Sequence, residues 1–191
     1  MTFELRNPVL ACSLAALAVL SGGSALADKG GNDNRTVGAQ LSGFQEVPVV
    51  STKGSGEFKA KINSQTNEIE YEFSYADMQA TVLQAHIHLG QRGVNGGIMV
   101  WLCQSAANPA PAAVAGFTPV CSSPAFSSGG IINAASIVGP GGAQQLGAGE
   151  LAELVAAFRA GVAYVNVHTA TSPGGEIRGQ IRSGSGHGHG H

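Results

Sequence analysis

The chain has 191 residues, 10 Lys and Arg against 12 Asp and Glu, and a formal net charge of −2 at pH 7. So few charges, with no basic cluster, exclude nucleic acid as an expected partner. The length is enough for one domain with a hydrophobic core.

Residues 1–27 have the pattern of a secretory signal peptide. An apolar run at 9–20 precedes Ala25 and Ala27, which occupy the small positions of a cleavage site. The run is short for the ~30 Å hydrocarbon core of a membrane. We therefore expect cleavage before Asp28, no membrane span afterwards, and a secreted or periplasmic protein. An uncleaved membrane anchor is the alternative.

Alternation of apolar and polar residues dominates the chain after a polar, disordered lead at 28–36. Strands are expected at 38–44, 57–62, 68–75, 82–89, 98–103, 131–138, 162–168 and 176–182. The second and third are separated by residues 63–67, which have turn chemistry and predict an antiparallel hairpin.

One segment has helical rather than strand periodicity. Leu151, Leu154, Val155 and Phe158 follow the i, i+3, i+4, i+7 spacing of an amphipathic helix. Gly161 is a plausible cap at its C-terminal end. About eight short strands and one helix predict an all-β, two-sheet sandwich with Greek-key connections.

The cysteines favour an oxidising compartment. Cys12 leaves with the signal peptide, so Cys103 and Cys121 remain as a pair and are expected to form a disulfide. The bridge closes a loop of roughly 18 residues and contributes about 3 kcal/mol in the chain-entropy model. Free thiols or soft metal ligands are the alternative.

The histidines are the most informative side chains. His86 and His88 occur two apart on an expected strand, so both imidazoles project from one face. His168 and Asn166 share a face of a later strand for the same reason. A turn centred near residue 172 then pairs His168 with Glu176, and Asn166 with Arg178.

Two interpretations of this cluster remain open. In the first, His86, His88 and His168 bind copper or zinc, with Glu176 as a further ligand or as an outer-shell partner of a ligand. In the second, Asn166, Glu176 and Arg178 join the histidines in a structural hydrogen-bond network without metal. There, Arg178 and the rings neutralise Glu176.

Residues 183–191 form a polar tail expected to be disordered. Its histidines alternate with glycine, at His187, His189 and His191, and can chelate transition ions weakly. The alternative is a solvated tail with no metal-binding role. Nothing in the chain predicts a catalytic nucleophile, because no serine lies in a Gly-x-Ser-x-Gly elbow.

Four segments resemble the CHRD (chordin-type) domain family: Leu41–Pro48, Ala85–Gly90, Tyr164–Thr169 and Pro173–Ile181. The resemblance spans roughly residues 37–182. It implies a secreted, immunoglobulin-like β-sandwich and supplies no catalytic residues. It does not carry over growth-factor binding, because this chain has one copy and none of chordin's cysteine-rich modules.

Three functions follow as expectations. The first is a secreted, non-catalytic binding module, with a transition metal in the histidine cluster as an option. The second is a metalloenzyme, because His86-Ile87-His88 is similar to a pair of copper ligands in copper/zinc superoxide dismutases. Three histidines outside the tail are, however, too few for a bridged copper–zinc site. The third is a purely structural envelope or matrix protein.

Overall fold

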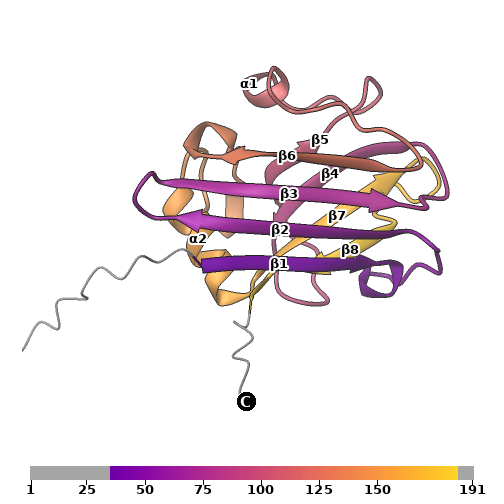
Figure 1. Ribbon diagram of the computed structural model, residues 1–191, viewed down its shortest axis with the longest axis horizontal. Helices are drawn as coiled ribbons and strands as arrows, with labels where there is room; N and C mark the ends of the chain where they lie inside the picture. Colours follow the sequence, from indigo (N-terminus) through magenta and orange to yellow (C-terminus); the bar gives the residue numbers. More distant parts are fainter. Residues whose placement is uncertain (1–34, 185–191) are drawn as a thin grey trace, which may run out of the picture. The chain divides into compact units, whose positions relative to one another are not determined.

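The computed structural model describes residues 35–184, and Figure 1 shows their arrangement. The strands are β1 Arg35–Ser42, β2 Ser55–Asn63, β3 Glu68–Ala76, β4 Val82–Leu89, β5 Ile98–Cys103, β6 Phe126–Ile132, β7 Ala163–Thr169, β8 Ile177–Gln180 and β9 Arg182–Ser183. The helices are α1 Ala112–Ala115 and α2 Leu151–Ala160, with 3-10 turns at Gly43–Gln45, Ala134–Ser136 and Gly142–Gln144.

Some sequence predictions fall outside this range. The signal peptide at 1–27 and the tail histidines, His187, His189 and His191, lie outside the described residues. Three residues that were expected to lie in the lead or the tail belong to strands. Arg35 and Thr36 already belong to β1, and Ser183 pairs with Val37 in β9.

The expected Greek-key sandwich of two sheets is not confirmed. Hydrogen bonds join the strands in one curled antiparallel sheet, in the order β5-β4-β7-β8-β1-β2-β3-β6, with β9 beside β1. The sheet turns its corner where β1 and β8 meet through one residue pair, Ser42 and Arg178. In Figure 1, β1, β2, β3 and β6 form the front of this sheet, and β4, β5, β7 and β8 cross behind them.

The predicted hairpin of β2 and β3 is confirmed residue by residue. Lys59 pairs with Glu72 and Lys61 with Glu70, so opposite charges face each other on the outer side. The predicted helix is also confirmed as α2, and Gly161 caps it in the left-handed conformation with φ 67°.

One strand differs from its prediction. We expected a strand at 131–138, whereas β6 covers Phe126–Ile132 and a 3-10 turn follows. Asn133 ends the strand, because its side chain accepts a hydrogen bond from the amide of Ala135 and its own amide donates to Ser136. At the other end, Phe126 extends β6 backwards by stacking on Tyr75.

The hydrophobic core fills the space between the front and back of the curled sheet. Phe58 of β2 and Phe158 of α2 meet edge to face with ring centroids 6.4 Å apart, and both are fully buried. Ile87 of β4 and Val165 of β7 also lie in this core. The inner face of the back strands is therefore apolar, and their other face is free to carry polar side chains.

A disulfide between Cys103 and Cys121 is confirmed. It joins the end of β5 to the loop that contains α1, a short helix that the sequence did not predict. Gln104 reinforces the same loop, because its amide donates to the carbonyls of Ala115 and Thr118. Among the described residues, no helix combines the length and apolar character that a membrane crossing requires.

Candidate metal centre

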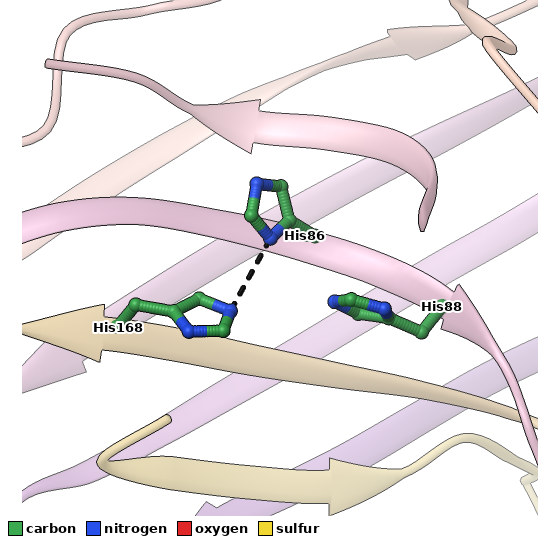
Figure 2. A group of neighbouring side chains, drawn as sticks. All are labelled: His86, His88 and His168. Carbon is green, nitrogen blue, oxygen red and sulfur yellow. Dashed lines mark hydrogen bonds between the residues drawn. The ribbon is translucent and has the colours of Figure 1, made fainter. Parts of the chain in front are cut away.

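Three histidines from two neighbouring strands converge on the polar face of the back of the sheet. His86 and His88 project from β4, and His168 projects from β7, which pairs antiparallel with β4. Figure 2 shows the three rings turned toward one another. Each ring offers one nitrogen that lies within 4.8 Å of the other two, and Nδ1 of His86 is 3.3 Å from Nε2 of His168. The predicted convergence is confirmed.

Backbone carbonyls fix the tautomers of two of these rings. Nδ1 of His88 lies 2.9 Å from the carbonyl oxygen of Gly96, and Nδ1 of His168 lies 2.9 Å from that of Pro173. Because a carbonyl oxygen only accepts, both Nδ1 atoms carry the proton. In these neutral rings, Nε2 then carries the lone pair that can bind a metal. Metal-ligating histidines in proteins are commonly held in this way.

Two of the ring nitrogens are buried and lack a hydrogen bond. Among the described side chains, Nε2 of His86 and Nε2 of His88 have no partner, although the two residues are only 0% and 7% exposed. Leaving a buried polar atom unsatisfied costs about 1–3 kcal/mol. Such atoms are rare in folded proteins and call for an explanation, an unseen ion being one.

Burial keeps the three rings uncharged at neutral pH. Burial, with a smaller effect of the other two rings, lowers the pKa of His86 to about 2. For His88, burial outweighs the hydrogen bond to Gly96 and lowers the pKa to about 4. The pKa of His168 is also lowered by burial, against the hydrogen bond to Pro173. A neutral imidazole is the form that ligates a metal.

Asn166 lies beside the cluster on β7, opposite His86. Its side-chain amide is 3.0 Å from Nε2 of His168, and the same side chain raises the pKa of His88. The residue therefore contacts two of the three histidines and helps to set their orientation.

Arg178 and Tyr164 position His88 from the neighbouring strands. The Tyr164 ring is parallel to that of His88, and the Arg178 guanidinium lies 3.4 Å from the Tyr164 ring centroid. Arg178 also donates to the carbonyls of Gln91 and Val94. Those residues belong to the loop that carries Gly96, so Arg178 holds the loop whose carbonyl orients His88.

Arg178 pairs with Asn166 across β7 and β8, in the register that the sequence predicts. Glu176, however, lies outside the histidine cluster. Its carboxylate accepts hydrogen bonds from the hydroxyls of Thr52 and Thr169 and from the amide of Gln79. These neutral donors replace the ion pair with Arg178 that one interpretation expected. The carboxylate is thus occupied away from the three rings.

Glu46 is a further residue of this region that was not predicted from the sequence. It is 4% exposed, its Oε1 has no hydrogen-bond partner, and burial raises its pKa to about 7 against the attraction of Arg178. Its signal was a single carboxylate in the otherwise uncharged segment Leu41–Pro48. Perturbed carboxyl groups of this kind cluster at functional sites.

A groove of about 1040 Å³ borders the cluster at His88 and Trp101. Trp101 is the chain's single tryptophan, and its ring centroid lies 4.2 Å from that of His86. The rest of the lining is uncharged and mainly apolar, with Ile98, Ile137, Val138 and Pro140 among its residues. The histidine cluster is therefore buried, but one of its rings reaches a surface groove.

Comparison with known proteins identifies one family. The model of the CHRD domain matches residues 37–181, which cover most of the chain. No curated protein and no solved structure shows a significant match.

Proposed function

The chain belongs to the CHRD domain family, and on this premise we propose that it is an exported, non-catalytic interaction module that binds one copper or zinc ion through His86, His88 and His168. The disulfide supports an oxidising compartment. The family supports an extracellular interaction role.

One observation carries the metal site. Nε2 of His88 is buried without a partner inside a cluster of three neutral imidazoles, and it is the nitrogen that this ring offers to an ion. A bound ion satisfies this lone pair and needs no proton to be removed from a charged ring. The 3.3 Å between Nδ1 of His86 and Nε2 of His168 also matches the edge of a tetrahedron with metal–nitrogen bonds of about 2.0 Å.

The surroundings favour a binding role over catalysis. Within the described residues, the group of metal-ligating side chains contains the three histidines and no carboxylate that could act as a general acid or base. An ion there links β4 to β7. It also fixes two loops, because the carbonyls of Gly96 and Pro173 are hydrogen-bonded to the ligands His88 and His168. We propose that these ordered loops present the surface that a partner recognises.

Metal content tests the proposal. The tail histidines are each changed to Asn in the full-length chain, so that the tail contributes no ligands, and bound metal is measured with and without His88→Ala. We expect about one ion per chain in the first protein and a large loss in the second. Trp101 fluorescence should change on loading, because the indole contacts His86.

Two other outcomes favour the alternatives. Stoichiometric copper together with superoxide dismutation supports a metalloenzyme, which is the alternative that the His86-Ile87-His88 motif suggests. Negligible metal in both proteins, with His88→Ala lowering only the stability, supports a purely structural role and contradicts the metal site.

A further inference from the structure

We propose that the site of His86, His88 and His168 takes its metal as the cuprous ion, Cu(I), in preference to any divalent ion. This inference rests on the proposed function, but it can fail while the metal site stands. It depends on the charge of the ligands, the charge of their surroundings and the burial of both.

The ligands carry no negative charge. All three are neutral imidazoles, and no carboxylate joins them within the described part of the chain. The nearest acidic residue in sequence to His168 is Glu176, whose carboxylate is held by Thr52, Thr169 and the amide of Gln79. Imidazole accepts copper and zinc alike, so the ligand type alone does not select the ion.

The surroundings add positive charge rather than negative charge. Arg178 is 2% exposed and lies on the same face, and its charge lowers the pKa of His88. Apart from the rings themselves, Arg178 is the ionisable side chain that shifts the pKa of a described ring, and no carboxylate is among the causes. Glu46 offsets Arg178 only in part, because burial raises its pKa to about 7.

Burial turns this charge balance into selectivity. The cost of placing an ion in a medium of low dielectric grows with the square of its charge, so a dication costs about four times as much as a monocation. No described carboxylate offsets the second charge at this cluster. A monovalent ion satisfies the same lone pairs at the smallest cost, and among copper and zinc only copper has a stable monovalent form.

Competition titrations test the preference. They use the full-length chain with the tail histidines changed to Asn, under anaerobic conditions, with bicinchoninate competing for Cu(I) and nitrilotriacetate for Zn(II). We expect Cu(I) to bind about 100-fold more tightly than Zn(II), or better. Trp101 fluorescence follows loading at the site. Tighter binding of Zn(II) than of Cu(I) overturns the inference and leaves the metal site intact.

A charge change at one atom tests the cause. Asn166→Asp places a carboxylate about where the amide lies, 3.0 Å from Nε2 of His168. We expect the ratio of the two affinities to move toward Zn(II) by about tenfold or more. Asn63→Asp, the same change at the last residue of β2, should leave the ratio unchanged. An unchanged ratio in Asn166→Asp overturns the electrostatic argument.

Arg178 provides a second, independent variant. Arg178→Gln removes the positive charge and should also move the ratio toward Zn(II), whereas Arg178→Lys keeps the charge and should not. Equal shifts in both variants would show that the ratio follows the loop contacts of Arg178 and not its charge, and this result also counts against the inference. Absence of any bound metal removes both the inference and the proposed function.

Discussion

The imidazole of His88 lies parallel to the phenol ring of Tyr164, with 4.8 Å between the ring centroids and 3° between the planes. The hydroxyl of Tyr164 accepts a hydrogen bond from the amide of Gly96, whose carbonyl in turn binds Nδ1 of His88. Tyr164 therefore constrains His88 twice, through its ring and through the loop. Since β7 lies between β4 and β8, the same ring also supports Arg178.

Two substitutions of Tyr164 separate these constraints. Tyr164→Phe keeps the stacked ring and loses the hydroxyl, so we expect a loss of about 1 kcal/mol in the free energy of unfolding and little change in metal affinity. Tyr164→Leu removes the stack and should lower metal affinity by about tenfold, as is usual for outer-shell partners. Urea unfolding and metal competition measure the two effects. Equal metal affinities in the two variants would contradict a role for the ring.

His86→Phe separates a metal site from a structural network. It removes the buried Nε2 atom that has no partner, at the cost of the contact with His168. An apolar ring of similar shape should leave the metal-free protein about as stable as before, because replacing an unsatisfied buried polar group by an apolar one is nearly neutral. The stabilisation that metal gives to the unsubstituted chain should disappear.

Denaturant unfolding with a chelator, and then with added metal, provides both measurements. A metal-free loss of more than about 2 kcal/mol would instead show that the hydrogen bonds of His86 matter for folding.

The sequence was sufficient to predict which strand face carries each histidine, because strand periodicity is local. His86 and His88 face one way whatever the rest of the fold does, and the β7–β8 turn sets Asn166 opposite Arg178. Which strands become neighbours is not local. The corner of the sheet depends on the pairing of Ser42 with Arg178, which come from opposite ends of the domain. No periodicity in the sequence predicts that pairing.

Side-chain partners were harder to predict than strand faces. The hairpin register put Glu176 near His168, but Thr52, from a distant loop, captures its carboxylate. Glu46 shows the same difficulty. It is buried because Gly175, at φ 130°, has no Cβ, and a Cβ there would lie 2.4 Å from the Glu46 carboxylate. Contacts between two loops of this kind have no sequence signal when each is read alone.

Acid should destabilise the metal-free protein through the buried histidines. Their folded-state pKa values are lowered from the usual 6.5, to about 2 for His86 and about 4 for His88. The unfolded chain therefore takes up their protons first, so stability is present above pH 6.5 and is lost as the pH falls.

Glu46 acts in the opposite sense between pH 7 and 4.5, because its pKa is raised in the folded state. Three histidines less one carboxyl leave a net uptake of up to about two protons on unfolding, or about 2.7 kcal/mol per pH unit. Unfolding titrations from pH 7 to 4.5 measure this slope. A flat profile would show that the rings are not buried in neutral form.

Glu46→Gln should stabilise the protein at alkaline pH. With the folded-state pKa raised from 4.5 to about 7, the wild-type carboxyl contributes its full stability below pH 4.5, and that contribution is lost as the pH rises through 7. The neutral amide avoids the buried charge, so the variant should exceed the wild type by up to about 3 kcal/mol at pH 8, and by much less at pH 5. Glu153→Gln, on the exposed side of α2, is the matched control and should show no such dependence on pH. Should Glu46→Gln prove less stable than wild type at pH 8, the attraction between Glu46 and Arg178 would outweigh the cost of burying the carboxylate.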